Sequence, residues 1–170
     1  MLENLVQLVR ENAQEAIVNN SAVPNEQNEV AIEAASTSIF DTLKEQLASG
    51  NVSQIAEIFN QGQASEANPV VQQATSSLTD KLGAFGINAD TAKSIGAALI
   101  PVILGKLANK TNDPNDSSFN IQDVLGKLAG GADGKFDLND VIGMFNGGQN
   151  QANGEQAGGG MLGKLKGLFN

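Results

Sequence analysis

The sequence predicts an all-α fold, a compact multi-helix bundle around one buried apolar helix at about 89–109. The segment Ile95–Leu107 carries no charge except Lys106, and small or apolar residues cover every side of a helix drawn through it. Such a helix should be enclosed by other helices. Apolar residues elsewhere in the chain recur at helical spacing. The 19 Gly against four Pro favour many short elements.

The apolar segment Ile95–Leu107 has thirteen residues, whereas a bilayer-spanning helix needs roughly 20. We expect no transmembrane helix here or elsewhere in the chain. The N-terminus has acidic residues from Glu3 onward and no basic region before its apolar residues, so it does not resemble a Sec signal peptide. These features favour a cytoplasmic location.

The first helix is expected at 2–18, because apolar residues fall at helical spacing there. Asn, Ser and Pro residues then interrupt the pattern. A long helix follows at about 26–48 and should end at Ser49–Gly50, since Gly readily takes a left-handed conformation. Its buried side is expected to contain Val30, Ile32, Ala35, Ile39, Phe40, Leu43 and Leu47.

A twelve-residue unit occurs three times, at 51–62, 120–131 and 137–148. Each copy opens with Asn or Asp, a natural N-cap, and closes on Gly. A polar residue three positions after the first could complete a capping box. The pattern predicts a two-turn helix in each copy. The caps are Asn51, Asn120 and Asp137, and their partners are Gln54, Asp123 and Asp140.

The larger arrangement also repeats, because a helix at about 70–85, capped by Asn68 with Pro69 in its first position, precedes the apolar helix. Residues 1–62 and 68–131 therefore form two similar helix–long helix–short helix units. With a further short helix at 138–146, they make one domain over 1–148. Pro101 lies inside the apolar helix, where we expect a kink rather than the start of a new helix.

The chain after the domain is polar and then amphipathic. Residues 149–160 are rich in Gly, Gln and Asn, which is typical of a flexible linker. A short amphipathic helix is expected at 161–169, with Lys164 and Lys166 away from its apolar face. That face is the candidate partner-docking site and consists of Met161, Leu162, Leu165, Leu168 and Phe169.

Composition excludes several classes of function. The chain has no Cys and no His, which removes thiolate nucleophiles, Cys/His zinc sites and Ser-His-Asp triads. No catalytic residue, cofactor or small-molecule substrate is indicated. The net charge is −9, and residues 1–66 hold ten acids against two bases, a net charge of −8. We therefore expect no nucleic-acid partner, because phosphate contacts need a basic surface.

Two acidic segments leave minor metal-binding alternatives. Residues 132–140 resemble the second half of a calcium-binding EF-hand loop, but Ala129 and Gly131 stand where the first ligands belong. The cluster at 112–116 contains two Asp and two Asn, a composition that more often builds Asx turns than metal sites. No pair of carboxylates stands out as catalytic, and no phosphate-binding loop is present.

The stretch GINADTAKSIGAALIPVILGKLANKTNDP, followed by a short helix bounded by Gly, resembles the YidB-like family of bacterial domains of unknown function (DUF937). The long Ala/Leu/Ile helix with Ile100–Pro101 and the Asn/Asp/Pro turn after it carry the resemblance, over roughly 70–148. The resemblance implies a small all-α bacterial domain and supplies no catalytic residues. The duplicated layout and the Gly-rich tail depart from the family pattern.

These observations favour a non-enzymatic helical interaction module whose tail mediates self-association or docks on a protein partner. A peripheral membrane or envelope-associated protein is the first alternative, although two lysines and about nine residues give weak membrane affinity. A carboxylate-based enzyme or a calcium-binding protein is the second.

Overall fold

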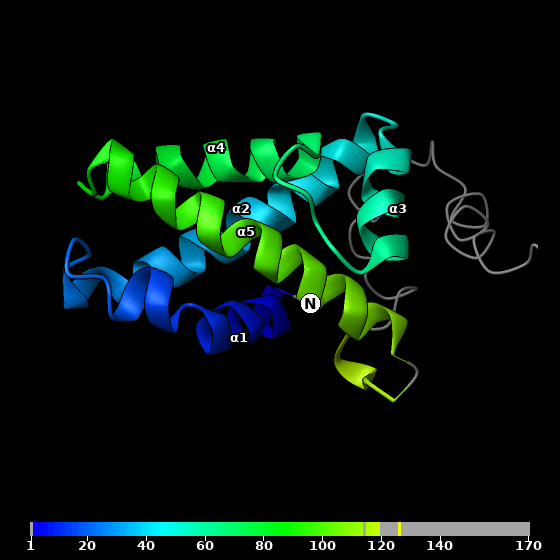
Figure 1. Ribbon diagram of the computed structural model, residues 1–170, viewed down its shortest axis with the longest axis horizontal. Helices are drawn as coiled ribbons and strands as arrows, with labels where there is room; N and C mark the ends of the chain where they lie inside the picture. Colours follow the sequence, from blue (N-terminus) through cyan, green and yellow to red (C-terminus); the bar gives the residue numbers. More distant parts are fainter. Residues whose placement is uncertain (1, 114, 120–125, 127–170) are drawn as a thin grey trace, which may run out of the picture.

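The computed structural model describes residues 2–113, 115–119 and 126, and no strand occurs among them. The all-α prediction is therefore confirmed. The α-helices of this described part, shown in Figure 1, are α1 (Leu2–Asn12), α2 (Asn28–Ala48), α3 (Val52–Gln61), α4 (Pro69–Ala84) and α5 (Ala89–Asn112). A π-helical turn covers Gln14–Val18, and 3-10 turns cover Asn25–Gln27 and Ser117–Phe119.

Helix α5 is the centre of the bundle, because it contacts all four of the other α-helices. Figure 1 shows it crossing in front of α2, with α4 on one side and α1 on the other. Six of its large apolar side chains are almost completely buried, as the sequence predicts. They are Ile95, Leu99, Ile100, Ile103, Leu104 and Leu107.

The expected enclosure of α5 on every side is wrong. Ala97, Ala98 and Val102 are exposed, and Val102 keeps 45% of its surface accessible. No element among the described residues covers this face, and its two alanines expose only small side chains. Pro101 is half-buried at its edge.

The helix continues through Pro101, so the alternative of a new helix beginning there is wrong. A proline lacks the N–H that would pair with the carbonyl four residues earlier. That carbonyl belongs to Ala97, an exposed residue, where water can replace the lost hydrogen bond.

The length of α5 also corrects an expectation. With 24 residues, it is the one helix in the described part of the chain that is long and apolar enough to cross a membrane. More than half of its most apolar window is buried by the other helices. A helix in the core of a bundle has the same composition.

The first helix is shorter than the expected 2–18. Helix α1 ends at Asn12, whose side-chain amide donates to the carbonyl of Leu8 at 2.7 Å and so competes with the backbone. A π-helical turn follows, in which the N–H of Val18 reaches the carbonyl of Ala13 at 3.2 Å. This wider turn keeps both Ala13 and Ile17 fully buried.

Several helix ends follow the predicted signals. Gly50 and Gly62 take left-handed conformations, with φ of 81° and 63°. The side chain of Asn68 accepts a hydrogen bond from the N–H of Val70, and Pro69 occupies the first turn of α4. The corresponding side chain of Asn88 caps α5 in the same way.

The predicted capping box at Asn51 does not form. The side chain of Asn51 makes no capping hydrogen bond, and its ψ is 40° rather than extended. Its backbone N–H is held by the carbonyl of Gln46 at 2.9 Å, so α3 starts directly from the end of α2. A side chain can turn back to cap a helix when the residue is extended, which this tight connection prevents.

The C-terminal end of α3 is held by α5. The side-chain amide of Asn112 donates to the carbonyl of Phe59 at 2.6 Å, and that of Asn109 donates to the carbonyl of Gly62 at 3.0 Å. The two segments also pack closely at Gly105, where an added Cβ would lie 3.4 Å from the Gly62 oxygen, an ordinary contact distance.

The internal duplication and the domain boundaries remain predictions. Residues 120–125 and 127–131, where the short helix of the second unit is predicted, lie outside the described residues. The same holds for the expected helix at 138–146, the linker at 149–160 and the helix at 161–169. Their caps, Asn120 and Asp137, are therefore untested as well.

Candidate functional site

The predicted docking residues Met161, Leu162, Leu165, Leu168 and Phe169 lie outside the described residues, and so does the EF-hand-like segment at 132–140. Among the hollows of the described surface, two have contrasting chemistry. One lies between α1 and the end of α5. The other lies between α2 and α4.

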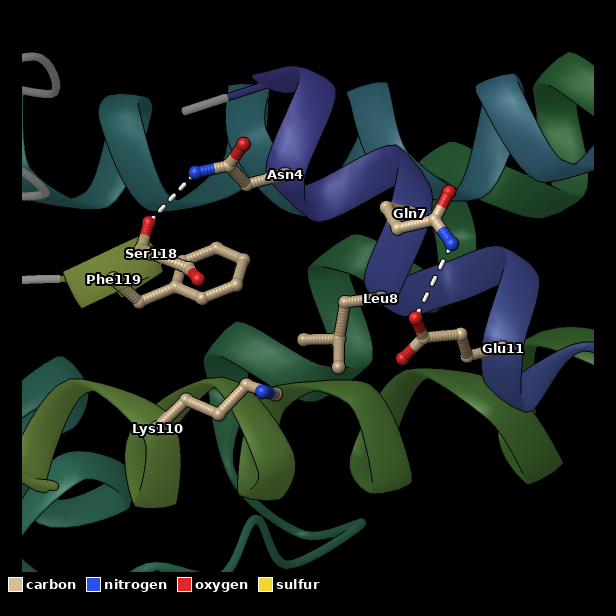
Figure 2. Close-up of a pocket in the computed structure, with 7 residues that line it drawn as sticks. All are labelled: Asn4, Gln7, Leu8, Glu11, Lys110, Ser118 and Phe119. Carbon is tan, nitrogen blue, oxygen red and sulfur yellow. Dashed lines mark hydrogen bonds between the residues drawn. The ribbon is translucent and has the colours of Figure 1, made fainter. Parts of the chain in front are cut away.

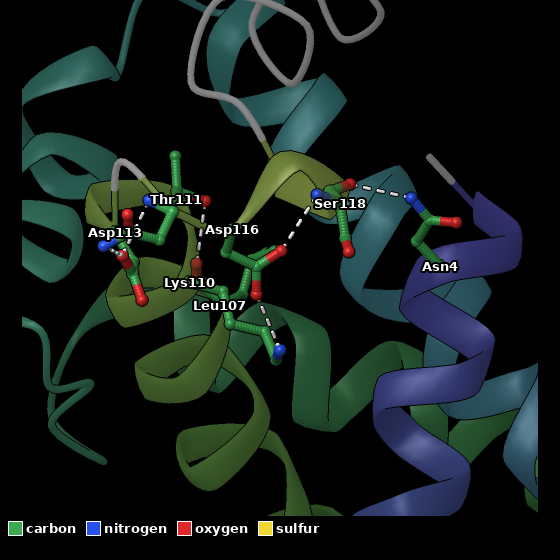
Figure 3. Close-up of polar contacts among 8 residues, drawn as sticks. Asn4, Leu107, Lys110, Thr111, Asp113, Asp116 and Ser118 are labelled. Atoms are coloured by element: carbon green, nitrogen blue, oxygen red, sulfur yellow. Dashed lines mark hydrogen bonds and ion pairs between the residues drawn. The ribbon is translucent and has the colours of Figure 1, made fainter.

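The Asn/Asp cluster at 112–116 forms Asx turns, as the sequence predicts. Asp113 Oδ1 accepts from the backbone N–H of Asn115 at 2.9 Å, and Asp116 Oδ1 accepts from that of Ser118 at 2.9 Å (Figure 3). Both carboxylates therefore shape the backbone. Among the described residues, no group of three or more Asp, Glu, His or Cys side chains is placed to hold a metal ion.

A short ion pair fixes this turn to α5. Lys110 Nζ donates to Asp116 Oδ2 at 2.8 Å. This hydrogen bond, with a second from the backbone N–H of Ser118, lowers the pKa of Asp116 from 3.8 to about 2. The same bond raises the pKa of Lys110, and burial opposes that rise.

The turn places Phe119 against α1. Phe119 is only 3% exposed, and the side-chain amide of Asn4 holds the neighbouring carbonyl of Ser118 at 2.7 Å. Figure 2 shows the cavity that remains beside this ring, with Leu8 and Lys110 on its walls. Its volume is about 140 Å³.

The polar side chains of this cavity already have partners within the protein. Glu11 Oε1 accepts from Gln7 Nε2 at 3.2 Å, and Lys110 is paired with Asp116. An acid and a base held in this way close the end of the bundle and offer a ligand little free hydrogen-bonding capacity. We therefore interpret this hollow as part of the fold rather than as a binding site.

The second hollow is a groove with two helical walls and a volume of about 260 Å³. Its α2 wall has the spacing i, i+3, i+4, i+7, and its α4 wall has the spacing i, i+3, i+4, so each wall is one helix face. Apolar atoms make up most of its lining. The α2 wall consists of Val30, Glu33, Ala34 and Thr37, and the α4 wall consists of Lys81, Ala84 and Phe85.

Polar contacts between α2 and α4 fix the groove at both ends. Lys81 Nζ pairs with Asp41 Oδ2 at 3.2 Å, one turn beyond Thr37. At the other end, Gln27 Nε2 donates to the carbonyl of Phe85 at 3.0 Å. The walls are therefore held at a set separation without any bound partner.

Phe85 is the principal apolar group of the groove, with 47% of its surface exposed. It caps the C-terminal end of α4, and Gly86 follows with φ of 87°. The N–H of Ile87 then donates to the carbonyl of Leu82 at 3.1 Å, which turns Ile87 into the core and leaves Phe85 outside.

Sequence reasoning missed this groove. Val30 and Phe40 were expected on the buried side of α2, yet both are only half-buried, and Val30 lines the groove. For Phe85, the sequence pattern predicts only that a helix ends there. The one local signal was an aromatic residue followed directly by Gly86 and an apolar Ile87, the pattern of a Schellman turn.

Comparison with known proteins identifies the family. No curated protein and no solved structure matches the chain. A family model described as a bacterial protein of unknown function (DUF937) matches residues 68–168, more than half of the 170 residues. The match includes α4, α5 and most of the segment 161–169, and it leaves α2 outside. The chain therefore belongs to the DUF937 family of bacterial proteins.

Proposed function

We propose that the chain is a non-enzymatic helical interaction module of the cytoplasm that associates with itself through the segment 161–169. The same segment would bind a protein partner in place of a second copy of the chain. The apolar, half-open groove between α2 and α4 is the observation that carries the proposal, because helical grooves of this kind bind amphipathic helices.

The chemistry of the chain supports a binding role. A sequence without Cys or His lacks a thiolate nucleophile and the imidazole that most often acts as general acid or base. Beside the cavity between α1 and α5, two acidic side chains are engaged, Glu11 by Gln7 and Asp116 by Lys110. The apolar surface of the groove has no such partner within the described part of the chain.

The apolar face of residues 161–169 supplies a matching ligand. Its five apolar residues fall within about one third of a helical turn around Leu165, given 3.6 residues per turn. An isolated helix of nine residues is marginal in water and gains stability by burying such a face. Docking on a protein surface would therefore stabilise this segment as a helix.

The test is light scattering coupled to size exclusion on the full 170-residue chain. We expect a mass above that of the 17.6 kDa monomer at tens of micromolar protein, and a monomer for a Leu165→Asp/Leu168→Asp variant. A Gln151→Asp/Gln156→Asp variant adds the same charge in the linker and should retain the wild-type mass.

Equal masses for the wild type and the Leu165→Asp/Leu168→Asp variant would refute self-association through the segment 161–169. Flotation with anionic vesicles distinguishes the membrane alternative. If the wild type floats, the Leu165→Asp/Leu168→Asp variant does not, and the wild type is monomeric, the segment binds lipid and the proposal is wrong.

A further inference from the structure

Three large apolar side chains are exposed among the described residues: Leu2, Phe85 and Val102. Leu2 lies in the first turn of α1 and lines none of the described cavities. Val102 lies on a hollow beside Lys106 and Asn109 whose lining is half polar. Phe85 alone stands in a predominantly apolar groove with two helical walls.

We infer that the groove between α2 and α4 is the receptor for the segment 161–169. This inference rests on the proposed function, which supplies that segment from a second copy of the chain. The side chain of Phe85 and the apolar atoms of Val30 and Ala34 would receive the apolar face around Leu165.

The length of the groove matches the length of the apolar face of 161–169. From Val30 to Thr37 the α2 wall covers seven residues, or about 10 Å at 1.5 Å per residue. The apolar face from Leu162 to Phe169 covers the same seven-residue step. A two-turn helix therefore fits between the ion pair of Asp41 and the hydrogen bond of Gln27 that bound the groove.

The charges agree as well. At 100° per residue, Lys164 and Lys166 flank the apolar face on its two sides, about 100° from Leu165. No acid lies between residues 156 and 170. The groove carries the exposed carboxylate of Glu33 on its α2 wall, and its one basic residue, Lys81, is already paired with Asp41. A helix with two lysines beside its apolar face would thus meet a wall that carries one carboxylate, Glu33.

The intervening chain is long enough. Forty-one residues separate Phe119 from Met161. Twelve of them form the predicted linker at 149–160, and twelve extended residues span up to about 40 Å. Helix α5, with 24 residues, is about 36 Å long. A segment tethered after the end of α5 can therefore reach the level of Phe85 at the start of α5, on its own copy or on a neighbouring one.

A nitroxide probe tests the contact directly, because the chain has no Cys and accepts a single one. Ala84→Cys places the probe on the groove wall, and Ala97→Cys places it on the exposed face of α5 as a control. Spin-labelled protein with nitrogen at natural abundance is mixed with ¹⁵N-labelled protein that carries no spin label, and both proteins are full-length. We expect the amides of 161–169 to broaden with the probe at Ala84→Cys and to be unaffected at Ala97→Cys.

The outcomes separate the two proposals. If the amides broaden only when the spin label and ¹⁵N are in the same chain, the segment binds the groove of its own chain. The groove then remains the receptor, and self-association is refuted. Equal or absent broadening from the two probe positions, in a protein that still associates through Leu165 and Leu168, would overturn the groove and keep self-association.

A matched pair of substitutions gives a second readout. Phe85 and Val102 are 47% and 45% exposed, so Phe85→Ser and Val102→Ser disturb the fold to a similar extent. We expect Phe85→Ser to raise the dimer dissociation constant about tenfold or more, as the loss of an aromatic anchor does, and Val102→Ser to leave it within about twofold. Equal effects would contradict the inference.

Discussion

The turns after α4 and after α5 each carry a phenylalanine, but Phe85 is 47% exposed whereas Phe119 is 3% exposed. After α4 the chain reverses at once through Gly86, and the hydrogen bond from Ile87 to Leu82 brings Ile87 into the core. After α5 the chain first runs through two Asx turns, and the seventh residue beyond the helix, Phe119, returns to the core.

The comparison shows that the hydrogen bonds of a turn, more than the apolar character of a residue, decide which side chain is buried. Ile87 fills the core at the start of α5, so the side chain of Phe85 lies outside the core, in the groove. At the other end, the pair of Lys110 and Asp116 holds the turn that buries Phe119. One end of the bundle is closed by its own chain, and the other leaves an aromatic side chain exposed in the groove.

The largest expected effect comes from shortening the two aromatic residues. Phe119→Ala should lower the free energy of unfolding by about 3 kcal/mol or more, because it empties a buried site. Phe85→Ala should change it by less than about 1 kcal/mol, because nearly half of its surface already meets water. Urea unfolding followed by circular dichroism measures both. Similar losses would show that the two turns do not differ as described.

A pair of glycines isolates the geometry of the turn after α4. Gly83 and Gly86 both have open space where a Cβ would be added, but only Gly86 has a positive φ, of 87°. Gly86→Ala should cost about 1 kcal/mol or more through the left-handed conformation. Gly83→Ala should add roughly 0.5 kcal/mol by favouring the helix. Thermal unfolding of the two variants should shift in opposite directions, and a shift in the same direction would contradict this.

The smallest effect concerns the ion pair after α5. The pKa of Asp116 is lowered to about 2 from 3.8, so its stabilising contribution is complete above about pH 4 and is lost as the pH falls towards 2. Carboxyl ¹³C shifts should show this titration near 2. Lys110→Met removes the hydrogen bond from the Lys110 ammonium group, the largest cause of the lowered pKa, so the pKa of Asp116 should rise towards its usual value. An unchanged pKa in that variant would show that Lys110 does not hold the turn.

Local signals in the sequence predicted much of the fold. Asn68 with Pro69 marks the start of α4, and Gly50 and Gly62 mark the ends of α2 and α3, because each acts within a few residues of itself. Two predictions failed at short-range contacts that apolar spacing and cap residues do not indicate. The Asn12 side chain donates to the Leu8 carbonyl where α1 ends, and the hydrogen bond from Asn51 to Gln46 fixes the Asn51 backbone so that its side chain does not cap α3.

The candidate site was harder to predict than the fold. The groove requires Val30 and Phe85, 55 positions apart, to face one another across two helices. Periodicity assigns Val30 to the apolar side of α2 but does not say where that side is left uncovered. The Asx turns near Asp113 were predictable from composition, whereas the pairing of Asp116 with Lys110 and the burial of Phe119 follow from how the turn lies on α5.

The hold of α5 on the end of α3 has a consequence for synthesis of the chain. Ten residues make a marginal helix, and the carbonyls of Phe59 and Gly62 receive their hydrogen bonds from Asn112 and Asn109, about fifty residues later. At 5–20 residues per second, a ribosome needs roughly 3 to 10 seconds to make that stretch. During that interval, the nascent chain holds α3 without its partner, so α3 completes its folding only after α5 has emerged.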